Sequence, residues 1–410
     1  MAASALEGVR VVEFDDETGS YCGRLFADLG AEVIKVEPPQ GGRERHTPPF
    51  IVSAGENVDT SLGFWVHNTS KKSVVLDLDD PTDRDRAQKL ALTADIVVED
   101  FAVGYLAARG LGYEELKASR PALVYASITG FGQDGPHAGW AYSDIIGQAV
   151  GGIMTLAGDP ADPPNRIYGN QANVSASIHA AYGALLALRR AEATGAGQLV
   201  DVSAQESVSI SQEIAMMTWD FQKVNKVRLG ISGSLPLPLP GIGAYEAADG
   251  HVLLFILAPG GAEFPVLVDW MREKGMAEDL DDEPFATLCN GLNMQMLTAL
   301  MGGQLDDIQA QIANLSHIND VVRRFIKTLP AREAYEEGQS RTLLVGLVST
   351  PADLAQNAQL RARDWYIKLD VDGDTTIEFP GPPYRLSRTP AAIARPPRLG
   401  EHTEEILASL

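Results

Sequence analysis

The chain has 410 residues, of which 45% are hydrophobic and 21% are charged, and this composition is typical of a folded globular protein. Its 33 basic and 55 acidic side chains give a formal net charge of −22, which disfavours nucleic acid or an anionic membrane as a partner. Two cysteines are too few for a disulfide scaffold, and no apolar run approaches the roughly 20 residues that span a bilayer. We therefore expect a cytoplasmic protein with neither a nucleic-acid nor a membrane partner.

The first third of the chain alternates predicted strands and helices. Short β-branched runs predict strands at Val9–Phe14, Val33–Val36, Val74–Leu78, Ile96–Val98 and Leu123–Ile128. Helices are predicted between them at Tyr21–Gly30, Pro81–Thr93 and Tyr113–Ser119. This alternation implies parallel strands joined by right-handed crossovers, so we expect an α/β fold with a doubly wound, Rossmann-like sheet.

The clearest helix is predicted over Ala176–Arg190. Its apolar residues at i, i+4, i+7 and i+8 form one face of a helix with a period of 3.6 residues: Ile178, Tyr182, Leu185 and Leu186. A further strand is predicted over Leu199–Val202.

The middle of the chain predicts a second, smaller domain. Leu235–Pro240 alternates apolar residues with proline and is interpreted as an extended linker. Asp249-Gly250 lies between two apolar runs within Tyr245–Ile256, which predicts a hairpin, and helical stretches follow to about Leu329. The expected domains are a large Rossmann-like domain over 1–227, a smaller α+β domain over 228–335, and a C-terminal part over 336–410 that returns to the large domain.

Gly130–Gly135 fits the GxGxxG pattern and follows a predicted strand. A dinucleotide site needs that loop to open directly into a helix, whereas Pro136, His137 and Gly139 follow here. A turn is favoured, and an NAD-dependent oxidoreductase is kept as an alternative. His137 is the one histidine with a candidate role in chemistry. We expect no metal site, because the sequence has no HExxH motif, and the lack of a GxSxG motif disfavours a serine hydrolase of that type.

Basic residues lie near the ends of several predicted strands, where open α/β sheets bind ligands. Arg43 and Arg45 follow the second strand, Lys71 and Lys72 precede the third, and Arg109 follows the fourth. The alternative interpretation is that these are solvated loop charges.

Several short motifs, in the same order along nearly the whole chain, resemble the family III CoA-transferases, the group related to carnitine CoA-transferase and α-methylacyl-CoA racemase. The motifs are Leu6–Glu13, Ala27–Glu37 (ADLGAEVIKVE), Ser127–Gln133 (SITGFGQ), Gly147–Gly152 (GQAVGG), Thr194–Val202 (TGAGQLVDV), Arg385–Pro390 (RLSRTP) and Leu399–Thr403 (LGEHT). The resemblance implies a Rossmann-like domain made from both ends of the chain, a smaller domain between them, and a dimer built like two interlocked rings.

The resemblance also implies a catalytic aspartate that attacks an acyl-CoA thioester, giving a mixed anhydride and the CoA thiolate. In the family this aspartate stands 21 residues before the threonine of the TGxGQ motif, and 194 − 21 = 173, which is Asn173 here. A carboxamide cannot form the anhydride, so this chain is expected to lack the nucleophile. From its position alone, Asn173 is interpreted as the N-cap of the helix that follows.

Other departures fall where the resemblance implies contacts with CoA. The candidate residues of a degenerate CoA site are Glu17, Thr18, Leu76, Asp77, Asp100, Phe101 and Arg109. Negative charge at Glu17, Asp79 or Asp100 opposes the phosphates of CoA. Pro38 stands where relatives often have a basic residue, and Arg109 is one position away from the usual arginine.

The leading hypothesis is a subunit of a family III CoA-transferase that pairs with a homologous subunit carrying the aspartate. It resembles in this respect the two-subunit benzylsuccinate CoA-transferases of anaerobic aromatic degradation, which implies succinyl-CoA as donor and a dicarboxylic acid such as benzylsuccinate as acceptor. No permanently bound cofactor is expected, because the CoA thioester is a substrate of the complex. The alternative within the same fold is an active acyl-CoA isomerase or lyase that uses His137, Asp144 or Glu17 as acid or base.

Overall fold

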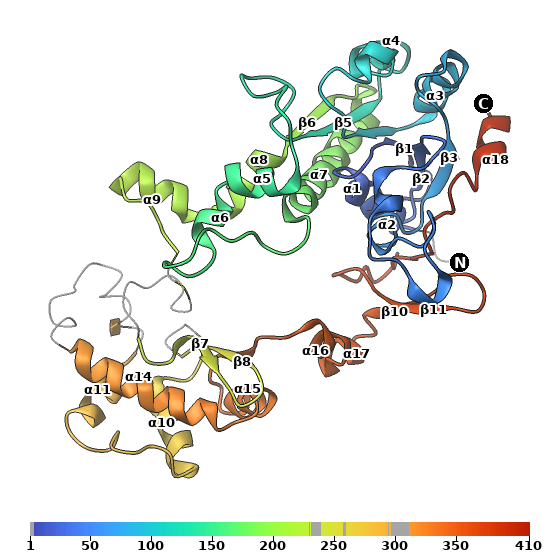
Figure 1. The fold of residues 1–410 in the computed structure, drawn as a ribbon. Helices are drawn as coiled ribbons and strands as arrows, with labels where there is room; N and C mark the ends of the chain where they lie inside the picture. Colours follow the sequence, from blue (N-terminus) through green and yellow to red (C-terminus); the bar gives the residue numbers. More distant parts are fainter. Residues whose placement is uncertain (1–3, 229, 231–238, 257–259, 294, 297–310) are drawn as a thin grey trace. The chain divides into compact units, whose positions relative to one another are not determined.

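The structure is a computed structural model that describes residues 4–228, 230, 239–256, 260–293, 295–296 and 311–410. Contacts within the chain divide it into two compact units (Figure 1). Unit 1 comprises Met1–Met154, Arg166–Asn225 and Ala358–Leu410, and unit 2 comprises Thr155–Asn165 and Lys226–Asn357. The sequence places 336–357 in the returning part, whereas these residues belong to unit 2, because strand β9 (Val345–Leu347) pairs with β8 (His251–Phe255).

Unit 1 is built on a six-stranded parallel sheet with the strand order β3-β2-β1-β4-β5-β6. The strands are β1 (Arg10–Phe14), β2 (Glu32–Glu37), β3 (Lys72–Val75), β4 (Ile96–Glu99), β5 (Val124–Thr129) and β6 (Leu199–Ser203). The predicted doubly wound, Rossmann-like sheet is confirmed. The strand order reverses between β1 and β4, and open α/β sheets form their ligand crevice beyond the carboxyl ends of the strands at such a reversal.

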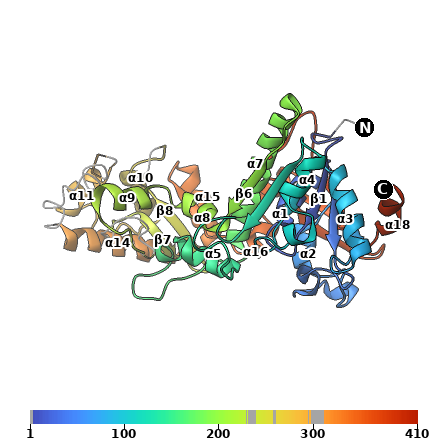
Figure 2. The ribbon, with the colours of Figure 1, turned by 90° about the horizontal axis from the view of Figure 1, so that it is seen from above.

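Helices cover both faces of this sheet, as the two views show (Figures 1 and 2). Helices α1 (Ser20–Ala27) and α7 (Gln171–Thr194) pack on one face, and α3 (Pro81–Thr93), α4 (Tyr113–Ser119) and the C-terminal α18 (Thr403–Ala408) pack on the other. Neighbouring strand residues such as Val11 and Val12 are both fully buried, and they point to opposite faces. This explains why the strands read as continuous apolar runs.

Helix α7 differs from its prediction in two ways. It begins at Gln171, with Asn170 at the N-cap position, so the interpretation of Asn173 as the N-cap is wrong. Its buried face consists mainly of alanines, including Ala176 and Ala180, whereas Tyr182 is 64% exposed and Leu186 53% exposed. The apolar periodicity identifies this helix, but small side chains form the face that packs on α1 and β5.

Unit 2 contains a three-stranded antiparallel sheet in the order β7-β8-β9, with β7 at Ile242–Glu246. The hairpin predicted around Asp249-Gly250 is confirmed by the pairing of β7 with β8. Its core includes Tyr245, Trp270 and Phe325. Its main helices are α10 (Phe264–Glu273), α11 (Phe285–Gly291), α14 (Ile312–Lys327) and α15 (Ala331–Ser340). Residues 235–238 of the predicted linker lie outside the described residues.

The remaining elements are short. They are η1 (Arg43–His46), η2 (Val52–Ala54), α2 (Leu62–His67), η3 (Ala107–Arg109), α5 (Asp144–Val150), α6 (Ile153–Leu156), α8 (Ala204–Ser209), η4 (Ile210–Gln212), α9 (Ile214–Gln222), α16 (Pro351–Ala355), α17 (Ala358–Ala362), β10 (Tyr366–Asp370) and β11 (Thr376–Pro380). Among the helices described, none combines the length and the apolar character needed to cross a bilayer.

Candidate active site

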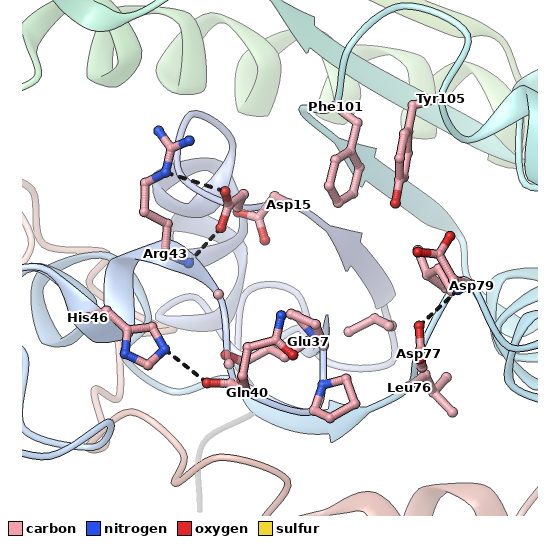
Figure 3. A pocket seen from close by; sticks show the side chains of 17 residues that line it. Asp15, Glu37, Gln40, Arg43, His46, Leu76, Asp77, Asp79, Phe101 and Tyr105 are labelled. Atoms are coloured by element: carbon pink, nitrogen blue, oxygen red, sulfur yellow. Dashed lines mark hydrogen bonds and ion pairs between the residues drawn. The ribbon is translucent and has the colours of Figure 1, made fainter.

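A cleft of about 650 Å³ opens beyond the carboxyl ends of β1, β2 and β3, beside the reversal of strand order (Figure 3). Its walls come from four segments of unit 1: Asp15–Asp16, Val36–Arg43 together with His46, Leu76–Asp79, and Phe101 together with Tyr105. Three of the candidate residues from the sequence, Leu76, Asp77 and Phe101, line the cleft. Phe101 and Tyr105 stack on each other, with ring centroids 4.7 Å apart.

Asp100 follows β4 and holds the loop between β1 and α1. Its carboxylate accepts hydrogen bonds from the main-chain N–H groups of Asp16 (2.9 Å), Glu17 (3.0 Å) and Gly19 (2.9 Å). Burial, and next the negative charge of Asp15, raises the pKa of Asp100 to about 7, although the three N–H groups act in the opposite direction. The same loop is joined to α7, because the Thr18 carbonyl accepts a hydrogen bond from the Ser177 hydroxyl (2.6 Å). Two candidate residues, Glu17 and Asp100, are thereby brought together.

Arg43, which lines the cleft, and Arg109, which is bonded to the lining residue Asp79, are both paired with carboxylates. Arg43 lies 3.3 Å from a carboxylate oxygen of Glu17 and 3.7 Å from one of Asp16. Arg109 lies 2.6 Å from the Asp79 carboxylate, and its guanidinium group lies 3.7 Å from the centre of the Tyr105 ring. The sequence brought Arg109 into consideration, but its partner Tyr105 was missed.

Two of the predicted loop charges are buried, so the interpretation as solvated charges is wrong for them. Arg45 is fully buried and pairs with Glu37 (2.6 Å) and Asp59 (2.8 Å). Lys71 is also buried, and it donates hydrogen bonds to Glu13 (2.7 Å) and to the Asn68 side chain (2.8 Å). Lys71 thereby joins the chain just before β3 to Glu13, 58 positions earlier in the chain, whereas Arg45 joins the loop after β2 to residues 8 and 14 positions away.

Beneath the cleft lies a buried cluster of charges formed by Glu13, Asp15, Lys35 and Lys71. The Lys35 ammonium group pairs with Asp15 and lies 3.1 Å from Glu13. Burial, and next the negative charge of Asp15, raises the pKa of Glu13 to about 8. Burial acts to raise the pKa of Asp15 as well, but the charges of Lys35 and Lys71 hold it below its usual range. Asp15 is therefore the ionised carboxylate of the pair, and Lys35 compensates its charge.

Asn173 is buried in the first turn of α7, and its carboxamide oxygen accepts a hydrogen bond from the Tyr142 hydroxyl (2.9 Å). Asp144 fixes this turn from α5, because its carboxylate accepts hydrogen bonds from the N–H groups of Ala172 (2.8 Å) and Asn173 (3.1 Å). Burial raises the pKa of Tyr142, so its hydroxyl stays a donor. Asn170, one turn before, donates to Glu17 (3.1 Å) and links position 173 to the loop after β1.

The glycine-rich segment after β5 packs against Tyr142. It does not lead directly into a helix. A Cβ atom on Gly130 would lie 2.4 Å from the Tyr142 ring, and one on Gly147 would lie 2.6 Å from its hydroxyl. The next helix after this segment is α5, which begins only at Asp144. His137 stacks on Trp140 in the intervening loop, with ring centroids 3.7 Å apart. These glycines therefore make room for the tyrosine that contacts Asn173.

Comparison of the sequence with known protein families identifies the family of this chain. The family model for CoA-transferase family III matches residues 6–403. The chain belongs to CoA-transferase family III. It is 33% identical to the BbsE subunit of succinyl-CoA:(R)-benzylsuccinate CoA-transferase from Thauera aromatica, over 97% of this chain and 92% of that protein. It is 30% identical to succinate–glutarate CoA-transferase from Agrobacterium fabrum, over 99% and 95% of the two chains.

A solved structure of a CAIB/BAIF family protein from Brucella suis is similar in fold to this CoA-transferase chain. It has a TM-score of 0.84 and 28% sequence identity, and the match covers 99% of both chains. CoA transfer is therefore the chemistry that this family III chain serves. Position 173, where the resemblance implies the aspartate, is held by Asp144 and Tyr142, but its side chain is a carboxamide.

Some residues of the cleft in this family III chain were not found from the sequence. Asp15 and Asp16 directly follow β1, so their place at the end of a buried strand was the available signal. Tyr105 and Tyr142 gave no such signal, because their roles depend on contacts with Arg109 and Asn173 that form only in the fold.

Glu99, at the end of β4, gives this family III chain a testable pH dependence. Its carboxyl group is buried, and burial raises its pKa to about 7 from an ordinary value of 4.5. The folded state then holds a proton that the unfolded state has released, so stability falls as the pH rises through 7. Between pH 5.5 and pH 8 this group should remove about 2 kcal/mol from the free energy of unfolding. In Glu99→Gln, urea unfolding at the two pH values should show a decrease in the free energy of unfolding that is smaller than in the wild type by this amount.

The control for this experiment is Glu192→Gln, because Glu192 is exposed on α7. It should leave the difference between the two pH values unchanged. Asp100 and Glu13, whose pKa values are also raised, should still contribute a loss in both variants. An equal pH dependence in the wild type and Glu99→Gln would contradict the assignment to Glu99.

Proposed function

We propose that this chain is the non-catalytic subunit of a hetero-oligomeric CoA-transferase that moves CoA from succinyl-CoA to a dicarboxylic acid such as benzylsuccinate. The observation that carries the proposal is Asn173. Its side chain is buried against Tyr142 in the first turn of α7, at the position where the resemblance implies the nucleophilic aspartate. An uncharged carboxamide cannot attack a thioester to give an anhydride, so the covalent step must use a carboxylate of another chain.

The names of the relatives support the substrate class. The BbsE protein is named as a subunit of succinyl-CoA:(R)-benzylsuccinate CoA-transferase, and another relative, 28% identical, is the succinyl-CoA–L-malate CoA-transferase beta subunit of Chloroflexus aurantiacus. Succinyl-CoA is the donor in both names, and both acceptors are dicarboxylates. We therefore expect the acceptor in the reaction of this chain's complex to be a dicarboxylate other than succinate.

A partner subunit is supported by the exposed apolar side chains of α7 and α9. On α7 the exposed residues are Ile178, Tyr182 and Leu186, and on α9 they are Ile214, Met216, Met217, Trp219 and Phe221. Exposed apolar side chains that gather on the surface of a helix are typical of a protein interface. The expected occupant is a homologous subunit that carries the aspartate.

The experiment expresses this chain alone, the homologous subunit alone, and both together, with succinyl-CoA and benzylsuccinate as substrates. Transfer is expected from the pair. Replacing the partner's nucleophilic aspartate with asparagine should lower kcat by about 1,000-fold or more, because the covalent step is lost. Asn173→Ala in this chain should keep activity within about threefold of the wild-type pair, since no step uses its side chain.

Mass spectrometry of each subunit during turnover supplies an independent readout. The covalent acyl or CoA adduct should form on the partner and not on this chain. Efficient transfer by this chain alone, or an adduct on one of its own carboxylates, would overturn the proposal.

A further inference from the structure

Beside the cleft, three main-chain N–H groups that could hold an anion are occupied by a carboxylate of the chain itself. In doubly wound sheets, N–H groups of the loop between the first strand and the first helix commonly receive a ligand's phosphate. Here the N–H groups of Asp16, Glu17 and Gly19 all donate to Asp100, at 2.9 to 3.0 Å. A phosphate group would have to displace a carboxylate that is covalently part of the protein and already makes three hydrogen bonds.

Arg43, the arginine on one side of the cleft, is neutralised by two carboxylates. Its main-chain N–H donates to Asp16 (2.6 Å), and its guanidinium group lies 3.3 Å from Glu17. The other oxygen of Glu17 accepts a hydrogen bond from Asn170 (3.1 Å). Glu17 is thus fixed from two sides, and it keeps Arg43 engaged at the mouth of the cleft.

Arg109, the arginine beyond the other wall, is engaged in the same way. The Asp79 carboxylate lies 2.6 Å from it, and the Tyr105 ring holds its guanidinium plane at 3.7 Å. Asp79 itself lines the cleft and is largely exposed, so it faces any ligand that enters. Arg109 is therefore placed beside the cleft but is paired with a fixed negative charge.

The remaining charges of the cleft add to this effect. Among its lining residues, Asp15, Asp16, Glu37, Asp77 and Asp79 are acidic and Arg43 is the one arginine or lysine, within the ranges that the structure describes. Figure 3 shows Asp77 and Asp79 on one side and Asp15 and Arg43 on the other. Asp15 and Glu37 are buried and paired with Lys35 and Arg45. Asp77 and Asp79 are the carboxylates that would repel the phosphates of a ligand.

We infer that this chain's own carboxylates close the cleft to the phosphate groups of CoA, with Glu17 and Asp79 as the residues that decide against binding. The inference rests on the proposed function, because a subunit without a nucleophile does not need to bind a CoA thioester for catalysis. Asp100 occupies the three main-chain N–H groups, Glu17 occupies Arg43, and Asp79 occupies Arg109. The cleft keeps the volume of a ligand site, but the one arginine or lysine among its described lining residues, Arg43, is already paired with carboxylates.

The test measures binding to the purified full-length chain by isothermal titration calorimetry at low salt, with CoA and with pantetheine. Glu17→Gln and Asp79→Asn are combined in one variant, which frees both arginines and removes two negative charges at little change in shape. The dissociation constant for CoA should fall by about tenfold or more, because each freed arginine can make a charge-assisted hydrogen bond to phosphate. Binding of pantetheine, which lacks the phosphates, should stay the same.

The matched control is Asp85→Asn with Glu192→Gln, which changes the net charge equally at exposed positions of α3 and α7. It should leave CoA binding unchanged. The inference is overturned if the wild type and the Glu17→Gln/Asp79→Asn variant bind CoA equally well or equally poorly. It is also overturned if the control or pantetheine gains as much as CoA does at the double variant. Strong CoA binding by the wild type would leave the proposed non-catalytic role standing, since that role is tested by transfer and by the location of the covalent adduct.

Discussion

Replacing Lys35 with methionine is expected to lower the free energy of unfolding by about 3–5 kcal/mol, because the buried Asp15 carboxylate loses the cation that is bonded to it directly. Lys35 is fully buried and pairs with Asp15 and Glu13, and it also donates a hydrogen bond to the Ser20 hydroxyl (3.1 Å). Its pKa lies well above the usual range, since the attraction of Asp15 and Glu13 outweighs the cost of burial. Urea unfolding at pH 7 measures the loss, which is a large share of the stability of a typical domain.

Lys72→Met is the matched control for this substitution. Lys72 is the neighbour of Lys71 on the way into β3, but its side chain is 31% exposed and pairs with the partly exposed Glu32 and Glu405. Its loss should cost no more than about 1 kcal/mol. Adding Asp15→Asn to Lys35→Met should recover part of the stability, because the buried carboxylate that lost its directly bonded cation is then gone. An equal decrease in the free energy of unfolding for Lys35→Met and Lys72→Met would show that the buried cluster stabilises the fold no more than a surface ion pair does.

The sheet could be predicted from the sequence because each strand is a local pattern. A run such as Val9–Phe14 is apolar on both faces, and the alternation with helices leaves few ways to order the strands. The face of α7 could not be predicted in the same way. Its largest apolar residues, including Tyr182 and Leu186, are exposed, whereas alanines are buried because the helix approaches α1 and β5 closely. Hydrophobicity alone does not separate a core face from an exposed apolar face.

The candidate site was predicted only in part, for a related reason. Leu76, Asp77 and Phe101 follow strands that meet at one edge of the sheet, so their shared cleft follows from topology. The ion-pair partners of the charged residues, however, do not follow from the topology of the sheet. Arg45 pairs with Glu37 and with Asp59, and Lys71 reaches Glu13, 58 positions earlier in the chain. Whether a loop charge is solvated or buried depends on which carboxylates the fold brings beside it, and no local sequence pattern contains that information.

Replacing Leu186 with aspartate is expected to separate this chain from its homologous subunit while leaving its own fold intact. Leu186 lies on the exposed side of α7, which also presents Ile178 and Tyr182, and all three are about half exposed or more. The buried side of the same helix consists mainly of alanines, and Leu186 does not belong to it, so a charge at Leu186 does not enter the core. An unpaired charge in a desolvated apolar interface should raise the dissociation constant of the complex by about 100-fold, the equivalent of roughly 3 kcal/mol.

Size-exclusion chromatography with light scattering, over a range of concentrations, measures this assembly, and circular dichroism checks the fold. Ala118→Asp is the control, because Ala118 is exposed on α4, which packs on the opposite face of the sheet, and it introduces the same charge. The control should assemble like the wild type. Unchanged assembly of Leu186→Asp would remove this side of α7 from the interface. Loss of assembly together with loss of CoA transfer would tie the exposed apolar face to the activity, since a chain without a nucleophile can contribute only through the subunit that it contacts.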